Sequence, residues 1–213
     1  MKSVKQNIIE YLDSKHRRLT IEDIDTAAEY YLRNPLLTAE WWRFFLGNRG
    51  QSPKAFFVMG QMLKPYDKQV YKTESLIERD KIIVIPIDNW ISVSPKKLLS
   101  NRKNVETTLR KLAIERMDRV TRLQLTIDNQ PTQSEPRILS PLFEIEVNHD
   151  NLQTLEMLEV GSVKAGQYFA ISDGYWLFIE PDSLSYGPHI IQTFGSCATG
   201  ALELEMSHTL RII

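Results

Sequence analysis

Two side chains in the C-terminal third of the sequence have the chemistry of an acid–base catalyst. His189 follows Gly187-Pro188 at the start of an expected strand, and a histidine can take up or release a proton near neutral pH. Asp173 precedes Gly174 between two apolar runs. A carboxyl group and an imidazole at the rim of a sheet could serve as general acid and base. Each also has a structural explanation, because histidine at a turn often binds a loop carbonyl and Asp-Gly is a favoured turn.

Four aromatic side chains could line a ligand-binding pocket. Trp41 and Trp42 are neighbours in an expected helix, and Tyr175 and Trp176 follow the Asp-Gly pair in an expected strand. Aromatic rings line many small-molecule sites, together with a few polar groups. Aromatic residues of strands are also common in protein cores, which is the alternative interpretation of Tyr175 and Trp176. We expect the pocket near Trp41, Trp42, Trp176 and His189.

The other chemistry-bearing residues form no recognisable motif. Asp88, His149, Asp150 and Asp173 are ligand types for a divalent cation, but only His149 and Asp150 are close in sequence, and neighbours in a strand point to opposite faces. Cys197 lies in a loop of small residues without a nucleophile's flanking signature, and such a cysteine is more often inert than catalytic. We find no phosphate-binding, dinucleotide-binding or metalloprotease motif. The sequence therefore predicts neither a metal site nor a cofactor.

The composition limits the classes of protein to be considered. The chain has 213 residues, 42% of them hydrophobic and 25% charged, as in an average globular protein. The net charge of −1 gives no global attraction to nucleic acid or to an anionic membrane. A single cysteine excludes an internal disulfide framework. No signal-peptide core and no membrane-spanning apolar run is present, so we expect a cytoplasmic protein that binds neither nucleic acid nor membrane.

Helices are expected mainly in the first part of the chain. Residues 1–37 are interpreted as an N-terminal helical segment, and residues 38–213 as a β-sandwich domain with packed helices. Within the first segment a helix should end at Asn34-Pro35, because a residue before proline avoids the helical conformation. A new helix should begin at Thr38 and carry Trp41 and Trp42. One mid-chain helix is expected within residues 95–120, with a stripe typical of a helix packed on a sheet.

Short strands separated by turn residues dominate the rest. They are expected at residues 55–59, 81–87, 122–127, 142–147, 167–171, 175–180, 189–194 and 201–212. Asp173-Gly174 should form a two-residue hairpin turn, so that four consecutive antiparallel strands make a C-terminal meander. Pro86 marks an edge or a bulge, and Asp128-Asn129 begins another turn. The predicted fold is α+β and mainly antiparallel, a β-sandwich or jelly-roll-like core with N-terminal helices and one mid-chain helix.

Several of these segments together resemble a family of bacterial and archaeal proteins of unknown function. The segments are Trp41-Trp42, Phe56 to Gly60, Ile85-Pro86-Ile87, Leu125 to Asp128, Ser140 to Phe143, Ser172 to Trp176, and Gly187 to Gly195. They occur in matching order over residues 38–195. The family typically has glycine where this chain has Asn129, often has a cysteine before the segment at Pro86, and has a different Phe56 to Gly60 segment. The resemblance implies the domain boundaries and the motif residues, but no activity.

Three functions follow as hypotheses. The first is a non-catalytic module that binds a small molecule or a protein partner through the aromatic residues. The second is an enzyme, such as a cyclase, isomerase or hydrolase, in which Asp173 or His189 acts as acid or base. The third is a homo-oligomer whose interface is the helix of Trp41 and Trp42.

Overall fold

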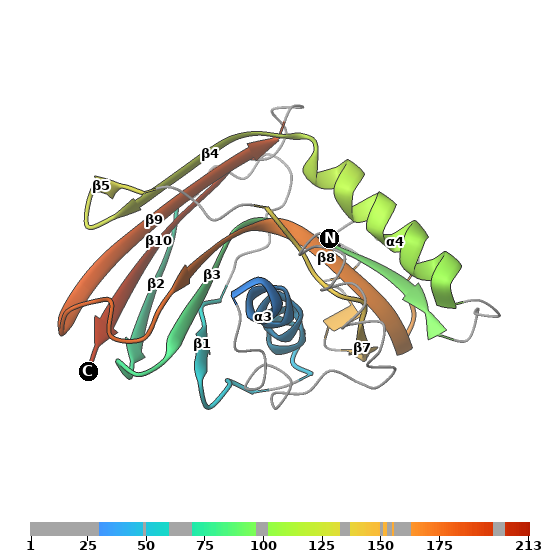
Figure 1. Ribbon diagram of the computed structural model, residues 1–213, viewed down its shortest axis with the longest axis horizontal. Coiled ribbons are helices and arrows are strands. Elements are labelled where there is room, and N and C mark those ends of the chain that lie inside the picture. Colours follow the sequence, from blue (N-terminus) through green and yellow to red (C-terminus); the bar gives the residue numbers. More distant parts are fainter. Residues whose placement is uncertain are drawn as a thin grey trace, which may run out of the picture.

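A computed structural model describes residues 30–48, 50–59, 70–96, 102–132, 137–149, 151–152, 155, 163–197 and 203–213. These residues include two long helices, α3 (Tyr30–Phe45) and α4 (Arg102–Met117). The strands are β1 (Ala55–Phe57), β2 (Val70–Ile77), β3 (Ile82–Pro95), β4 (Val120–Ile127), β5 (Gln130–Pro131), β6 (Ile138–Leu139), β7 (Phe143–Val147), β8 (Gly166–Ile179), β9 (Gly187–Cys197) and β10 (Glu203–Ile212). Figure 1 shows how they form two sheets.

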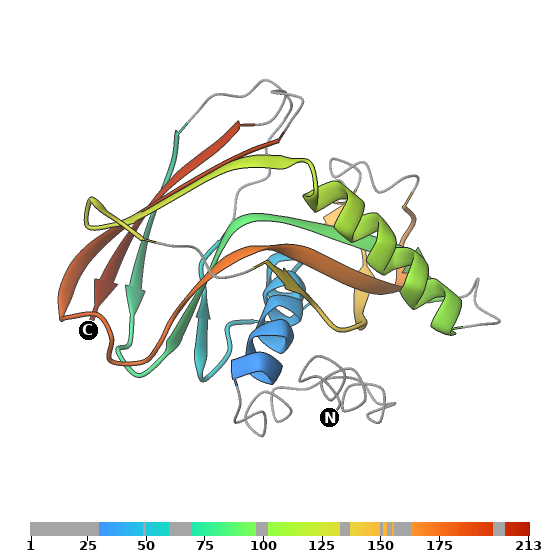
Figure 2. The same ribbon diagram turned by 45° about the horizontal axis from the view of Figure 1, so that its top comes forward.

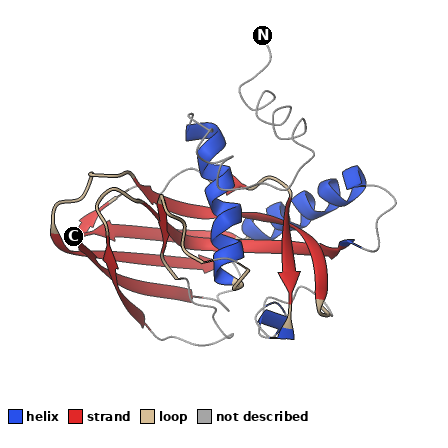
Figure 3. Ribbon diagram, turned by 90° about the horizontal axis from the view of Figure 1, so that it is seen from below, coloured by secondary structure: helices blue, strands red, loops and turns tan. Residues whose placement is uncertain are grey.

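Sheet A is a curled half-barrel built on two long strands. β3 and β8, each of 14 residues, pair antiparallel along almost their whole length. β1 pairs parallel with β3, while β6 and β7 pair antiparallel with β8. The concave side of this sheet encloses α3, and α4 lies on the convex side over β3 and β8 (Figure 1). Figure 3 shows α3 crossing the strands of the sheet behind it.

Sheet B covers the remaining part of the convex side. Its strand order is β2-β10-β9-β4-β5, and only the β2–β10 pair is parallel. Two of the connections between the sheets are the turn from β2 to β3 and the loop from β8 to β9. Both connections lie at the same end of the molecule, beside the C-terminus (Figure 2). They are tied together there by Arg79, whose carbonyl accepts the Asp182 N–H (3.0 Å) and whose N–H donates to Ile213 O (3.1 Å).

Three apolar clusters hold these layers together. The largest fills the concave side of sheet A around α3 and includes Trp41, Trp42 and Trp176. A second, aliphatic cluster lies between the two sheets, with Ile85 and Ile191 fully buried. A third cluster packs α4 against the convex side of β8. Alternation along β3 and β8 produces this layering, because successive residues of a strand point to opposite faces and both faces are covered.

The expected fold class is confirmed, but the arrangement of its C-terminal strands is different from the prediction. Asp173-Gly174 is not a hairpin turn, because both residues lie in the middle of the continuous strand β8. β8 and β9 lie in different sheets, so the predicted four-stranded meander is wrong and only β9 and β10 pair. Gly174 is needed for contact between strands, since a Cβ there would lie 2.4 Å from Asn89 Cβ. Close backbone approach explains this glycine as well as turn chemistry would.

Two further expectations are corrected by the structure. The helix predicted to end at Asn34-Pro35 continues through it, because α3 has Pro35 within its first two turns. The Thr38 hydroxyl donates to Pro35 O (2.8 Å), and Leu36 and Leu37 are fully buried, so packing outweighs the local cost of the proline. β2 lies between residues 59 and 81, where no strand was expected, and its charged residues face solvent at alternate positions.

The predicted turn at Asp128-Asn129 is confirmed. Both residues have positive φ, 52° and 64°, and they join β4 to β5 as a two-residue hairpin. The bulge suggested by Pro86 is also present, as a register shift in β3 between Pro86 and Asp88. No helix within the described ranges is long and apolar enough to cross a membrane.

Candidate functional site

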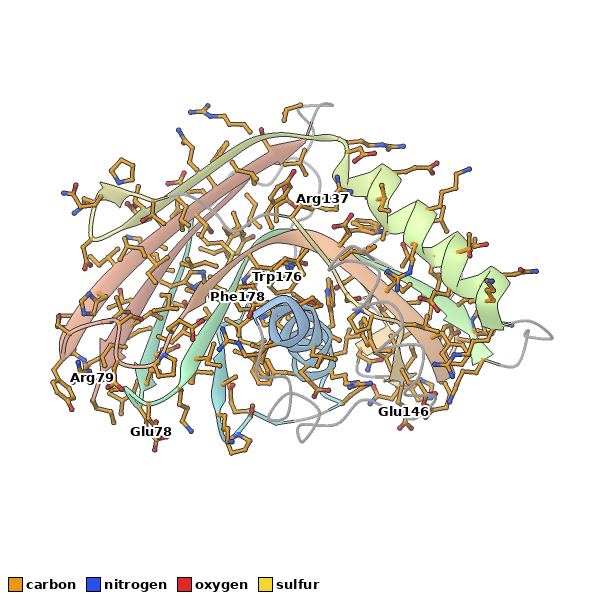
Figure 4. The ribbon with its side chains drawn as sticks, in the orientation of Figure 1. Glu78, Arg79, Arg137, Glu146, Trp176 and Phe178 are labelled. Carbon is orange, nitrogen blue, oxygen red and sulfur yellow. The ribbon has the colours of Figure 1, made fainter. Side chains whose placement is uncertain are left out.

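Asp173 points to the convex side of sheet A and is held by an arginine. The Arg137 guanidinium donates to Asp173 Oδ2 from Nε (2.8 Å) and from Nη2, and to Asp118 Oδ1 from Nη1 (2.5 Å). Arg137 also donates to Ile114 O of α4 (2.7 Å), so it ties β6 and β8 to the C-terminal end of that helix. Burial raises the pKa of Asp173, and Arg137 offsets only part of this effect. In Figure 4, Arg137 lies on the opposite side of β8 from Trp176 and Phe178.

His189 is engaged at both ring nitrogens. Its Nδ1 lies 2.7 Å from Asp128 Oδ2 and its Nε2 lies 2.9 Å from Ser185 O. Both partners are acceptors, so the fully bonded ring is the protonated imidazolium. The pKa of His189 is accordingly raised: burial opposes protonation, but the hydrogen bonds to Asp128 and Ser185 outweigh it. The other Asp128 oxygen accepts from Ile190 N–H (2.8 Å), and this clamp joins the β4–β5 hairpin to the start of β9.

The predicted aromatic residues lie in two different places. Trp41, Trp42 and Trp176 form one cluster inside the half-barrel, with the Trp41 ring 5.2 Å from Trp42 and 5.4 Å from Trp176. Each is at most 2% exposed, so within one chain these rings belong to the core. Tyr175 points the opposite way from Trp176 and is half-buried against the intersheet cluster. The structure therefore brings Trp41, Trp42 and Trp176 together, and separates them from Tyr175 and His189.

The bulge in β3 turns the Asp88 carboxylate into the space between the sheets. In such a bulge the extra residue and the next one face the same side. Ile87 accordingly packs in the intersheet cluster, and Asp88 pairs with Tyr175 and faces β9. There it meets Gly195, where an added Cβ would be 2.8 Å from Asp88 Oδ2. Gly195 is thus the residue whose missing side chain leaves room for the Asp88 carboxylate.

Two further polar side chains point inward from sheet B. Thr193 is two residues from Gly195 and so shares its inward face. His208 pairs with Ile191 on the neighbouring strand β10, and therefore lies diagonally from Thr193 on the same face. Thr193 is 1% exposed to solvent and His208 is 0% exposed. Neither Thr193 Oγ1 nor His208 Nε2 has a hydrogen-bond partner in the described structure. The other ring nitrogen of His208 lies 2.6 Å from Thr73 Oγ1.

We call Asp88, Thr193 and His208 the intersheet polar row. Burial raises the pKa of Asp88 to about 6 and lowers the pKa of His208 to about 4. At neutral pH the row therefore presents a carboxylate and an uncharged imidazole. The structure shows no hydrogen bond or ion pair to Asp88 from any described residue, and no cation contributes to its pKa. Three polar groups with unused hydrogen-bonding capacity thus lie between two otherwise apolar faces.

Two residues here were candidates from the sequence, Asp88 as a metal ligand and Tyr175 as a pocket residue, but the sequence did not indicate the row itself. Asp173 and His189 share no partner: Arg137 binds Asp173 beside α4, whereas Asp128 and Ser185 bind His189 beside the β4–β5 hairpin. Thr193 and His208 were missed because in sequence they alternate like ordinary core residues. The usable signals were Pro86, which marks the bulge that turns Asp88 inward, and Gly195.

Among the candidate metal ligands that the structure describes, none joins Asp88 in a group able to hold a metal ion. His149 is exposed, Asp150 and the Cys197 side chain lie outside the described residues, and Asp88 and Asp173 do not share a metal site. No group of three or more His, Cys, Asp or Glu able to hold a metal ion occurs in the described part of the chain. Comparison with protein-family models, curated proteins and solved structures found no match to the chain.

Proposed function

We propose that this protein is a binding module that holds a small polar molecule at the intersheet polar row. The observation that carries the proposal is the unused hydrogen-bonding capacity of the row, above all at Thr193 Oγ1 and His208 Nε2. Buried polar groups in folded proteins nearly always have a partner, and leaving one unmade costs about 1–3 kcal/mol. A bound molecule that supplies these hydrogen bonds would recover that energy.

The surroundings of the row support access for a ligand. Asp88 and Tyr175 are half-buried, as are Leu123 and Leu204 on the facing sheet, so this part of the intersheet space is not sealed. The neighbouring Ile85 and Leu177, in contrast, are closed off by the aliphatic cluster. The arrangement has the composition of a small-molecule site, with apolar walls and a few convergent polar groups.

The concave side of sheet A supports the proposal less well. Trp42 Nε1 and Trp176 Nε1 also have no hydrogen-bond partner among the described residues, but they lie in a cluster whose rings are almost completely buried. The enzyme hypothesis with Asp173 or His189 as acid or base also has less support, because Arg137 holds the first side chain and Asp128 and Ser185 hold the second.

Contacts between motif residues support the resemblance to the uncharacterised family. Asp128 of one segment binds His189 of another, and Gly195 of the last segment accommodates Asp88, which follows the segment at Pro86. Residues that belong to separate motifs but touch in space are expected where a family maintains one site. We therefore propose membership of that family.

Titration of labelled protein with three related probes tests the proposed function. The probes are 1,4-butanediol, 4-amino-1-butanol and 4-hydroxybutyrate, which share a four-carbon chain with a hydroxyl at one end and carry a hydroxyl, an ammonium or a carboxylate at the other. We expect at least one to shift the NMR signals of the Thr193 methyl group and the His208 ring. The variants Thr193→Val and His208→Asn should weaken this binding at least about tenfold together, since each removes a hydrogen-bonding group.

Thr209→Val is the matched control, because Thr209 lies on the outer face of β10. It should leave the titrations unchanged. Shifts that map to the outer face of sheet B, or no binding by any of the three probes, would remove the support for an intersheet site.

A further inference from the structure

We infer that the molecule held in the intersheet polar row carries a primary ammonium group, bound at Asp88. The inference rests on the proposed function and adds to it the charge and the outline of the ligand. Its basis is the unpaired carboxylate, the kinds of atom that line the row and the length of the row.

Among the described residues, no cation compensates the negative charge of the row. Opposite Asp88 stands Tyr175, an uncharged phenol, and the next pair of positions on the same face holds Trp90 and Asp173. Two guanidinium groups lie on this side: Arg137 is committed to Asp173 and Asp118, and Arg116 lies over the Trp90 ring, 4.2 Å from its centroid. His208 is kept neutral by burial. A half-buried carboxylate without a cation is unfavourable, so a ligand cation at this position would stabilise it.

The lining atoms match the donors of an ammonium group. An ammonium has three N–H donors and no acceptor. Asp88 offers carboxylate oxygens, and the Thr193 hydroxyl can accept. His208 Nε2 presents a lone pair when Nδ1 carries the proton and donates to Thr73 Oγ1, which lies 2.6 Å away. A ligand anion would find only like charge at Asp88, and would be excluded for that reason.

The row is longer than a single ion. Asp88 lies at Gly195, whereas His208 pairs with Ile191, four residues back along β9. At about 3.3 Å per residue these positions are about 13 Å apart along the strand, and the inward side chains occupy part of that distance. A molecule with an ammonium at one end and a hydroxyl or similar group a few bonds away would contact both ends of the row. This points to amino alcohols and related small primary amines.

Calorimetric titration at pH 7.5 tests the inference with matched probes. We expect 4-amino-1-butanol to bind at least about tenfold more tightly than 1,4-butanediol, because the charged hydrogen bond is the stronger one, and 4-hydroxybutyrate not to bind. n-Butylammonium, which lacks the distal hydroxyl, should bind more weakly than 4-amino-1-butanol. In Asp88→Asn the preference for the amine over the diol should disappear.

Asp80→Asn serves as the control, since Asp80 is an exposed carboxylate in the turn before β3. It should keep the wild-type preference. Equal or tighter binding of the diol would overturn the ammonium inference and leave the proposed function standing. Tighter binding of 4-hydroxybutyrate would overturn it in the same way. If no probe bound, both the ammonium inference and the proposed function would be overturned, and internal water would be the hydrogen-bond partner of the row.

Discussion

At the scale of single residues, the row combines two titratable groups that burial shifts in opposite directions. Asp88 holds its proton more tightly in the folded state than in the unfolded state, and His208 holds its proton less tightly. Between pH 4 and 6 their effects on stability therefore oppose each other, and the wild-type curve of stability against pH conceals both. Single variants would separate them.

Replacing Asp88 by asparagine should stabilise the protein in a pH-dependent way. The pKa of Asp88 rises from 3.8 to about 6 on folding, so ionisation above pH 6 destabilises the folded state by as much as about 3 kcal/mol. The excess stability of Asp88→Asn over wild type should grow from near zero below pH 4 to that order above pH 6. Urea unfolding at several pH values measures it, with Asp80→Asn as control. A difference that does not change with pH would contradict the burial of this carboxylate.

Replacing His208 by asparagine should have the opposite effect on the pH profile. The pKa of His208 falls from 6.5 to about 4, so the unfolded state binds the proton better, and this residue lowers stability as pH falls from 6.5 to 4. Asparagine can keep the hydrogen bond to Thr73 but cannot be protonated. His208→Asn should therefore lose less stability than wild type between pH 6.5 and 4. Parallel unfolding curves for the two proteins would show that His208 is not buried as a neutral ring.

At the scale of elements, contact between β3 and β9 is the feature that creates the row. Gly195→Ala would place a Cβ 2.8 Å from Asp88 Oδ2 and 3.0 Å from Asp88 Cβ. We expect a loss of about 1–3 kcal/mol in the free energy of unfolding, and a smaller loss when the same change is made in Asp88→Ala, which lacks the carboxylate.

Gly50→Ala is the control for this pair of measurements, because nothing lies within 4 Å of a Cβ added at Gly50. It should change stability little. If Gly195→Ala cost the same with and without the Asp88 carboxylate, the two residues would not be neighbours across the sheets.

The His189–Asp128 clamp, which joins the β4–β5 hairpin to β9, should also be pH-dependent. The pKa of His189 is raised by its partners and the pKa of Asp128 is lowered, mainly by the hydrogen bond from His189. The pair therefore contributes stability above the lowered pKa of Asp128 and loses it as pH rises through the raised pKa of His189. A double-mutant cycle with His189→Gln and Asp128→Asn should give a coupling of about 1 kcal/mol at pH 6 and clearly less at pH 9. Equal coupling at both pH values would argue against an imidazolium in the clamp.

The sequence predicted those elements whose signals are local. Alternation located most strands, and two residues that tolerate positive φ located the turn at Asp128-Asn129. The same turn chemistry failed at Asp173-Gly174, because a glycine that permits close strand contact looks identical in sequence to a glycine that makes a turn. Likewise Pro35 looked like a helix end, although burial of the residues around it keeps α3 continuous.

At the scale of the whole molecule, the long strands β3 and β8 of sheet A form the central layer, with α3 on one face and sheet B and α4 on the other. The inner half-barrel buries the tryptophans around α3, and the outer side is covered first by sheet B and then by α4 (Figures 1 and 2). Which strand belongs to which sheet is a non-local property that alternation does not encode. For the same reason the sequence could suggest Asp88 as a polar residue near a bulge, but not that Thr193 and His208 lie across from it.

The central claim is that Asp88 is a half-buried carboxylate, without a cation among the described residues, that receives a small ammonium compound. Titration of the Asp88 side-chain carbon signal by NMR, with and without saturating 4-amino-1-butanol, tests it most directly. The account predicts a pKa near 6 in the free protein and a clear decrease when the amine is bound, because the cation favours the ionised form. A value near 3.8 in both samples, unaffected by the amine, would contradict it.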